Sequence, residues 1–532
     1  MMTQVGATRR GRETRSEARP REASRLARAR WSRGCGSIAG IMETLATPLL
    51  EEATGGRDVF LDVDLRRGQL RRNLRGAIRE AIQDGRLATG TRLPSSRRLA
   101  TDLRVSRGVV ADTYDQLTAE GYLETQPRQA PLVAGVGAAP PLPDEPARPT
   151  WAVDFIATTP DVELFPRRAW IRATERALRK APNEALDYGD HRGRIELRRA
   201  LSAYLGRVRG VRIEPERMAI TQGFTQGLDL VSRVLLARGA TTIAYESPSQ
   251  PSGWATPMGA GLRVEGIAVD RDGIRTDELD ALTAAAIIVT PAHQFPTGAV
   301  MAPERRADLV AWANREDRLI IEDDYDAEFR YDRNAIGAIQ GLDPCRVIHI
   351  GTASKTLAPG IRLGWMSLPD ELVDEVRAAK AAQDSGSPAL EQLALAELIE
   401  SGDYDRHVAR ARHVYRQRRD GLIAALARHL PGLTVQGAAA GLHVLLRLPD
   451  GVDDVAVQAV AAERGIGVNP LSPMSHSGTS DSGLVVGYSR LTVESIDGAV
   501  AALAGSLEEA GVPGIRPRPR SPRPGSPRAR RG

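Results

Sequence analysis

The chain contains 532 residues, 42% hydrophobic and 26% charged, a composition close to that of ordinary soluble proteins, which excludes a wholly disordered chain or a coiled coil. Its two cysteines, Cys35 and Cys345, are too few for a disulfide framework or a cysteine-based zinc cluster. No stretch reaches about 18 consecutive apolar residues and no apolar segment follows the charged start, so we expect neither a membrane span nor a secretory signal, and a cytoplasmic location.

The net charge of +5 is unevenly distributed along the chain. Residues 1–41 hold ten arginines against three acidic residues, and residues 512–532 hold seven arginines and no acidic residue. Residues 69–134 hold eleven arginines against seven acidic residues, whereas residues 151–511 carry a net charge of −9. A basic front joined to an acidic body predicts an anionic partner for the front of the chain.

Shifts in composition and periodicity divide the chain into six segments. The first and the last lack apolar periodicity and are rich in arginine, and the segment before the acidic body holds five prolines and little apolar bulk. We therefore predict a disordered basic tail at 1–60, a compact front unit at 61–134, a proline-rich linker at 135–150, a large domain at 151–369, a small domain at 370–511 and a disordered tail at 512–532.

The front unit has the pattern of three short helices and a hairpin. Apolar residues recur every four positions from Leu70 to Ile82, which predicts a first helix. Ser95 or Ser96 can cap a second helix, and Ser106 can cap a third whose apolar positions share one face. Residues 122–125 follow with the pattern of a strand, so we predict a winged helix-turn-helix.

In the body, short apolar runs rich in β-branched residues alternate with helical patterns such as 225–237 and 302–314. This alternation predicts an α/β fold with a mostly parallel sheet. After about residue 370 the pattern changes to long helices with a few strands, which predicts a smaller α+β domain. The expected strands are 219–221, 242–245, 286–290, 319–322 and 347–350 in the large domain, and 442–448 and 483–489 in the small one.

Three short motifs of the front unit stand at the spacing found in one family of regulators: LPSSR at 93–97, VSR at 105–107 and EGYL at 120–123. On these motifs the unit resembles the winged helix-turn-helix of the GntR regulators. The resemblance implies a double-stranded DNA operator as partner, with the first turn of the third helix in the major groove. An arginine there can bond guanine or phosphate. The expected DNA contacts are Ser95, Arg97, Ser106, Arg107, Gly108 and, on the wing, Arg128.

A second constellation surrounds Lys355, which follows an apolar strand and lies among small residues. Enclosure lowers the pKa of a lysine and makes its amine a nucleophile, as a Schiff base with pyridoxal 5'-phosphate requires. Asp323, at the carboxyl end of a buried strand, can hold the pyridine nitrogen, and Tyr325 can donate to the phenolic oxygen of that cofactor. The phosphate is expected at a strand-to-helix turn and two further residues: Gly223, Phe224, Thr225, Thr352 and Arg362.

These motifs, in this order, resemble the fold-type I aminotransferases, and joined to the front unit they resemble the MocR subfamily of GntR regulators from about residue 65 to 510. The resemblance implies a homodimer in which each head can pack on the partner's body. Two positions depart from it. Gln250 stands where the family has an aromatic residue against the cofactor ring, and Val485 aligns with the arginine that binds the substrate carboxylate in aminotransferases. The regulators' alternative arginine falls near Ser475 and His476, which leaves Arg490 as the nearest candidate.

The leading hypothesis is a transcriptional regulator dependent on pyridoxal 5'-phosphate, whose aminotransferase-like body senses an amine, an amino acid or the cofactor itself. The alternative is an active aminotransferase with an accessory DNA-binding head. A third possibility is a DNA-binding protein with a cofactor-free dimerisation scaffold, against which the set of Asp323, Tyr325, Lys355 and Arg362 argues. No metal site is expected, because no pair of histidines has the spacing of metal ligands.

Overall fold

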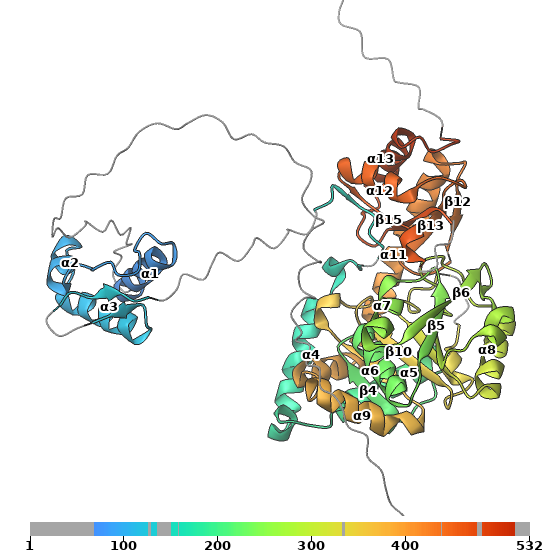
Figure 1. Cartoon of the computed structure of the whole chain (residues 1–532), viewed down its shortest axis with the longest axis horizontal. Helices are drawn as coiled ribbons and strands as arrows, with labels where there is room; N and C mark the ends of the chain where they lie inside the picture. The colour runs from blue at the N-terminus through green and yellow to red at the C-terminus, as the bar shows by residue number, and fades with distance from the viewer. Residues whose placement is uncertain are drawn as a thin grey trace, which may run out of the picture. The chain divides into compact units, whose positions relative to one another are not determined.

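A computed structural model of the chain describes residues 69–125, 129–135, 150–157, 159–331, 336–437, 439–475 and 481–515. The chain divides near residue 147 into two compact units, a head and a body (Figure 1). The predicted tail at 1–60, nearly all of the linker and of the last tail, and Arg128 lie outside the described residues. In the described part of the chain, no helix is both long and apolar enough to cross a membrane.

The head consists of three helices and a two-stranded antiparallel hairpin, which confirms the predicted winged helix-turn-helix. The helices enclose a core of fully buried side chains that includes Leu74, Ile78, Val110 and Leu117. The elements are α1 Leu70–Gln83, α2 Ser96–Asp102, α3 Arg107–Ala119, β1 Leu123–Glu124 and β2 Leu132–Val133.

The two predicted serine caps of the head differ in outcome. Ser95 caps α2, because its side chain accepts a hydrogen bond from the backbone N–H of Arg98. Ser106 occupies the cap position of α3, but its side chain makes no capping hydrogen bond, so the prediction of a side-chain cap there is wrong. The Ser106 hydroxyl is exposed beside the first turn of α3.

The body is built on an eight-stranded sheet of order β4-β11-β10-β9-β8-β5-β6-β7. The pairs joining β10, β9, β8, β5 and β6 are parallel, whereas β11 is antiparallel to both of its neighbours. The mostly parallel α/β sheet is therefore confirmed. The strands are β4 Met218–Thr221, β5 Thr242–Ser247, β6 Arg263–Asp270, β7 Gly273–Ile274, β8 Ala286–Val289, β9 Leu319–Asp324, β10 Val347–Thr352 and β11 Gly364–Ser367.

Helices cover both faces of this sheet. Side chains alternate along a strand, so neighbours in sequence meet opposite layers: Ile321 and Ile348 pack with α6 and α9, whereas Ile320 and Val347 pack with α8. Burial on both faces explains why these strands are continuous apolar runs in the sequence. The α-helices of the body are α4 Arg167–Lys180, α5 Ile195–Arg209, α6 Phe224–Ala237, α7 Pro251–Ala260, α8 Pro303–Arg315, α9 Asp370–Asp384, α10 Ala389–Glu400, α11 Asp403–His429, α12 Asp454–Glu463 and α13 Ile496–Glu509.

A second, antiparallel sheet of order β12-β13-β16-β15 forms the smaller core of the body with α12 and α13. Helix α11 joins the two cores: Tyr404 packs in the large one and Leu422 in the small one. The segment that follows the linker also docks here, because β3 Val153–Asp154 pairs with β14 Ile466–Gly467. The remaining strands are β12 Thr434–Gln436, β13 His443–Arg447, β15 Asn469–Pro470 and β16 Gly483–Gly487.

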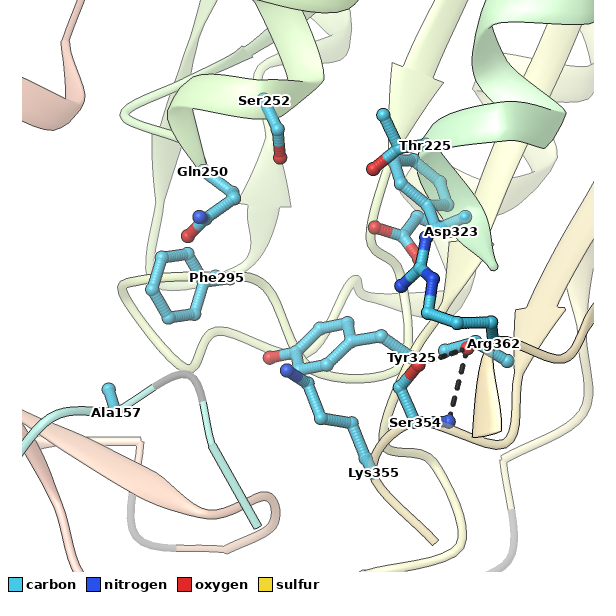
Figure 2. A pocket seen from close by; sticks show the side chains of 12 residues that line it. Ala157, Thr225, Gln250, Ser252, Phe295, Asp323, Tyr325, Ser354, Lys355 and Arg362 are labelled. Atoms are coloured by element: carbon cyan, nitrogen blue, oxygen red, sulfur yellow. Dashed lines mark hydrogen bonds between the residues drawn. The ribbon is translucent and has the colours of Figure 1, made fainter. Parts of the chain in front are cut away.

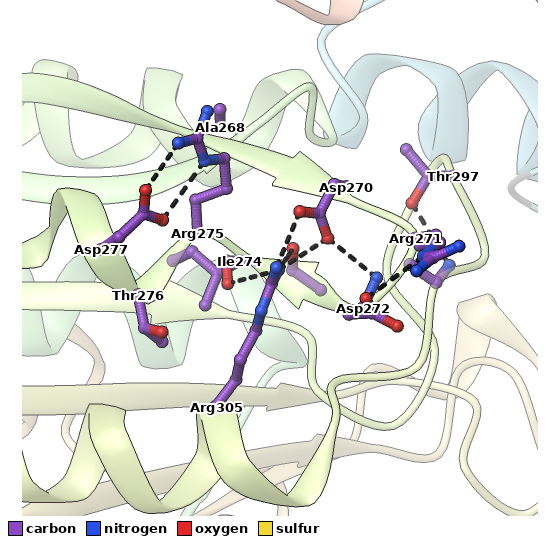
Figure 3. A network of polar contacts seen from close by, with 12 residues as sticks. Ala268, Asp270, Arg271, Asp272, Ile274, Arg275, Thr276, Asp277, Thr297 and Arg305 are labelled. Carbon is purple, nitrogen blue, oxygen red and sulfur yellow. Dashed lines mark hydrogen bonds and ion pairs between the residues drawn. The ribbon is translucent and has the colours of Figure 1, made fainter.

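An arginine near the start of α8 forms hydrogen bonds to the β6–β7 hairpin at the edge of the large sheet (Figure 3). Arg305 donates to both carboxylate oxygens of Asp270, at 2.6 and 2.7 Å, and to the carbonyl oxygens of Gly273 and Ile274, at 2.7 and 2.9 Å. The bidentate hydrogen bond from Arg305 holds the pKa of Asp270 below its ordinary value.

Arg305→Ala should lower the free energy of unfolding of the body by about 1–2 kcal/mol, because two enclosed carbonyl groups lose their donor. Urea denaturation followed by tryptophan fluorescence measures this, since five of the six tryptophans lie between residues 151 and 365. Arg271→Ala is the matched control, because the Arg271 side chain is 91% exposed; it should change stability by no more than about 0.5 kcal/mol. An equally small change in Arg305→Ala would show that the hairpin does not depend on this arginine.

Candidate functional site

A cavity of about 190 Å³ lies at the carboxyl ends of β9 and β10, beside the start of α6 (Figure 2). Ligands of open α/β sheets bind at this edge of the strands. Seven of the eight residues predicted for the cofactor site line the cavity, and the eighth, Gly223, lies against Arg362. The lining consists of Ala157, Phe224, Thr225, Gln250, Ser252, Phe295, Asp323, Tyr325, Thr352, Ser354, Lys355 and Arg362.

Asp323 reaches the cavity from β9, and Lys355 reaches it from the turn that follows β10. Burial lowers the pKa of the Lys355 amine, although the charges of Asp326 and Asp323 act in the opposite direction. Burial also raises the pKa of the Asp323 carboxyl well above its ordinary value, and the charge of Asp324 adds to this. The Asp323 Oδ1 atom is enclosed and has no hydrogen-bond partner within the described structure. An enclosed oxygen of this kind is suited to share a proton with a ligand nitrogen.

The neighbouring carboxylate, Asp324, has a structural role. Its Oδ2 atom accepts from Arg209 Nε at 2.8 Å and lies 2.9 Å from His349 Nε2, with all three side chains buried. Burial alone would raise the pKa of Asp324, but Arg209 and His349 hold it below its ordinary value. Of the two adjacent aspartates, Asp323 therefore faces the cavity and Asp324 pairs within the core. No sequence signal linked Arg209 and His349 to this site.

Tyr325, which is half-buried, shares a hydrogen-bond network with the buried side chains of His293 and Asp326. The Tyr325 hydroxyl donates to the His293 carbonyl oxygen at 3.0 Å. The Nδ1 atom of His293 lies 3.1 Å from that hydroxyl and 3.0 Å from Asp326 Oδ2. Burial, together with the charges of Asp326 and Asp323, raises the pKa of Tyr325 well above its ordinary value, so the hydroxyl keeps its proton at neutral pH. Asp326, which orients His293, is a site residue that our sequence reasoning did not assign.

The turn between β4 and α6 forms a cradle with Arg362. Gly223 has a φ of +92°, which favours glycine, and a β-carbon there would lie 3.4 Å from Arg362 Nη1. Arg362 donates to the Gln222 carbonyl oxygen, and Thr225 lies in the first turn of α6. The first turn of a helix presents backbone N–H groups that have no partner inside the helix and that bind anions. Arginine and helix terminus together suit a phosphate.

The opposite wall of the cavity contains no arginine or lysine in the described structure. Gln250 precedes α7 and lines the cavity, and Phe295 supplies an aromatic ring that our sequence reasoning did not assign. Val485 is fully buried in β16, opposite Leu445. Arg490 does not line the cavity and instead pairs with Asp154 at 2.7 Å. Ser475 is buried outside the cavity lining, and His476 lies outside the described residues.

In the head, the predicted DNA contacts that the structure describes lie at the starts of two helices. Ser106, Arg107 and Gly108 are exposed at the start of α3, and Ser95 and Arg97 are exposed at the start of α2. Within the described residues, neither the Arg97 nor the Arg107 guanidinium group takes part in a salt bridge. Both groups are therefore open to a polyanion, Arg107 in the first turn of the third helix, which reads the groove in such folds, and Arg97 in the first turn of α2.

Two protein families match this chain. The family described as "Bacterial regulatory proteins, gntR family" matches residues 70–133. The family described as "Aminotransferase class I and II" matches residues 159–503, which contain every residue of the cavity except Ala157. The two matches follow the division of the chain into head and body.

Similar proteins extend over most of the chain. The uncharacterized HTH-type transcriptional regulator YhdI of Bacillus subtilis is 36% identical, over 79% of this chain and 91% of the relative. The HTH-type pyridoxine biosynthesis transcriptional regulator PdxR of Corynebacterium glutamicum is 33% identical, over 77% of this chain and 90% of the relative. The probable rhizopine catabolism regulatory protein MocR of Rhizobium meliloti is 31% identical, over 79% and 90%. The solved structure of an archaeal alanine:glyoxylate aminotransferase has a TM-score of 0.63 and 31% identity, over 67% of this chain and 91% of that chain.

Proposed function

Since the chain belongs to the MocR subfamily of GntR-type transcriptional regulators, we propose that it is a cytoplasmic regulator whose body holds pyridoxal 5'-phosphate at Lys355 and controls operator binding by the head. Binding of an amine, an amino acid or the cofactor itself would change that control. The observation that carries the proposal is the presence on one chain of an exposed recognition-helix start and a cavity lined by a half-buried lysine. The similarity to PdxR, which is named as a pyridoxine biosynthesis transcriptional regulator, supports it.

The residues of the cavity fit pyridoxal 5'-phosphate. Lys355 would hold it covalently, and Asp323, whose enclosed oxygen lacks a partner in the described structure, would bind the pyridine nitrogen. The Gly223 turn with Arg362 would hold the phosphate, and Tyr325 would face the phenolic oxygen. When bound, the cofactor supplies an aldehyde carbon that bonds primary amines.

The segment that follows the linker offers a physical connection between cavity and head. Ala157 lines the cavity, and Phe155, two residues earlier, is buried in the small core. A ligand that binds one arrangement of the small core more tightly than another would therefore shift the segment that leads to the head. Such a difference in affinity is what coupling of two sites requires.

We propose that the body is a sensor and a slow aminotransferase, because the position aligned with the carboxylate-binding arginine is Val485 and no described arginine replaces it. Transamination needs the substrate fixed in one orientation, for which a bidentate arginine is the usual means. Single-turnover absorbance spectra with a panel of amino acids test this. Complete conversion of the cofactor at about 1–1000 per second would instead establish an active aminotransferase.

We also propose a homodimer, in which each head can pack on the partner's body. Exposed apolar side chains gather between residues 171 and 188, and they include Ile171 and Leu178 on one face of α4, which are 64% and 49% exposed. Leu186 and Tyr188, which follow α4 in the chain, are 61% and 88% exposed. Contiguous apolar patches of this kind mark protein interfaces. Sedimentation equilibrium of the full chain measures the oligomeric state.

Arg107→Ala should weaken binding of the head to its operator by about 1–3 kcal/mol and relax specificity at one base pair, if the guanidinium reads guanine. If Arg107 contacts only phosphate, affinity should fall equally for all sequences and the salt dependence should become shallower. Fluorescence anisotropy with a duplex obtained by in vitro selection, and with a scrambled duplex, separates the two cases.

Arg86→Ala is the matched control for this experiment. Arg86 is an exposed arginine of the head that follows α1, pairs with Asp84 and belongs to neither α2 nor α3. It should leave both affinity and salt dependence nearly unchanged. If Arg107→Ala behaves in the same way, Arg107 does not lie at the DNA interface.

A further inference from the structure

The one arginine in the described lining of the cavity, Arg362, lies on one side of it. Lys355 and Arg362 are the two basic residues of its described lining, and Arg362 belongs to the cradle around Gly223. Figure 2 shows Arg362 and Thr225 on one side of the cavity and Gln250, Ser252 and Phe295 across from them. With Arg362 on the phosphate and Lys355 on the cofactor, the opposite side holds uncharged groups.

The wall behind that side is apolar. Ala157 and Phe295 line the cavity and also belong to a buried cluster with Leu445, Met474 and Val485. Val485 and Leu445 stand opposite each other in the antiparallel pair of β16 and β13 and are both fully buried. This wall can accept hydrocarbon and offers no charged partner.

Two further arginines of the body, Arg412 and Arg330, form hydrogen bonds to backbone carbonyl groups. Arg412 donates to the Glu328 carbonyl oxygen at 2.7 Å, and Arg330 donates to the Ala292 carbonyl oxygen at 3.1 Å. Neither of them lines the cavity. Among the described residues, a ligand carboxylate on this side would therefore exchange its hydration for apolar side chains without gaining a cation, which is unfavourable.

We propose that this cavity takes primary amines that have an apolar body and no carboxylate, in preference to the corresponding amino acids. The proposal rests on the proposed function, since it concerns the ligand of the same cofactor site. Its physical basis is the apolar wall, which gains from buried hydrocarbon, together with the absence of a described cation that could pair with a carboxylate. Gln250 and Ser252 can bond a neutral polar group but cannot neutralise a charge.

The test compares three pairs of ligands on the full-length, cofactor-loaded protein: 2-phenylethylamine with phenylalanine, 3-methylbutylamine with leucine, and propylamine with 4-aminobutanoate. Each is titrated at one pH, and both the cofactor absorbance and the midpoint of thermal unfolding are followed. We expect each amine to half-saturate both signals at a concentration at least about tenfold below that of its carboxylated partner. Equal or stronger binding of the carboxylated partners, or no response to any amine, would overturn the proposal.

A substitution at the cavity wall tests the cause of the preference. Gln250→Arg adds a cation to a half-buried position without disturbing β16, and it should shift the concentration ratio at least about tenfold toward the amino acids. Gln250→Leu, of similar size and without charge, should keep the preference for amines. If the arginine variant keeps the wild-type ratio, the missing cation is not the cause and the proposal fails. If the proposed function itself is wrong, the purified protein will retain no pyridoxal 5'-phosphate, which is a different result from an unchanged ratio.

Discussion

Lys355→Ala should abolish the borohydride-reducible covalent link between the protein and pyridoxal 5'-phosphate. The chain contains three lysines, Lys180, Lys355 and Lys380. Lys355 lines the cavity, and burial lowers the pKa of its amine, which increases the fraction able to bond an aldehyde. Lys380 is fully buried and held by Asp384 at 2.6 Å. Reduction, proteolysis and mass spectrometry of the cofactor-labelled peptide measure the site of attachment.

Because the chain has only three lysines, substitution of another lysine provides a clear control for this experiment. Lys180→Ala removes a lysine that is 66% exposed on α4 and pairs with Glu397, and it should leave the labelled peptide and its yield unchanged. Noncovalent cofactor can remain in Lys355→Ala, because the cradle around Arg362 does not include the lysine. A cofactor-labelled peptide of wild-type yield in Lys355→Ala would reject the assignment of this residue.

Much of the architecture could be predicted from the sequence, because local patterns determine it. The four-residue apolar repeat from Leu70 gave the first helix of the head, and buried β-branched runs gave the central parallel strands. Strands β6 and β11 were not predicted. The residues of β6 are mostly exposed or half-buried next to the edge of the sheet, so it lacks a continuous apolar run. Strand β11 has four residues and begins with Gly364, which weakens the strand signal.

The candidate site was predictable where a residue adjoins a strand end or a helix start, as Asp323 and Lys355 do. Contacts between distant parts of the chain were not. Arg209 lies 115 positions from Asp324, and His293 lies 33 positions from Asp326. From the sequence alone, a polar side chain that is buried with a partner cannot be distinguished from one that is exposed, because the partner is distant in the chain. Local pattern can therefore name the groups that face the cavity, but not the groups that hold them in place.

Asp324→Ala should lower the free energy of unfolding of the body by about 3–5 kcal/mol, because it leaves a buried arginine charge without its anion. The side chains of Arg209 and Asp324 are 4% and 6% exposed, and the two groups lie 2.8 Å apart. His349, at 2.9 Å from the same oxygen, loses its partner as well. Urea denaturation followed by tryptophan fluorescence measures the loss.

A second ion pair on the same helix provides the matched control. Arg207, two residues before Arg209 on α5, pairs with Asp405 at 2.8 Å, with side chains 59% and 43% exposed. Asp405→Ala should therefore cost no more than about 1 kcal/mol. The pKa of Asp324 is lowered in the folded state, so its contribution is complete above its ordinary pKa of 3.8 and is lost as the pH falls through the folded value. Burial alone would lower the pKa of His349, but Asp324 raises it above its ordinary value of 6.5, and stability from that histidine is lost as the pH rises. The wild-type advantage over Asp324→Ala should therefore be larger at about pH 5 than at about pH 8, and it should shrink again below about pH 4.

The buried pair also acts on the cavity, because the charge of Asp324 raises the pKa of Asp323. Removing that charge should lower the pKa of Asp323. The Asp323 carboxylate would then bind less tightly the proton that it shares with a ligand nitrogen. The double variant Asp324→Leu with Arg209→Met removes both charges, and it should recover most of the lost stability, since a well-packed apolar pair often replaces a buried ion pair without loss. If the double variant recovers stability but not the cofactor absorbance, Asp324 acts separately on the stability of the body and on the pKa of Asp323. If Asp324→Ala lowers the free energy of unfolding no more than Asp405→Ala does, the ion pair of Arg209 and Asp324 does not stabilise the carboxyl end of β9, where Asp323 lies.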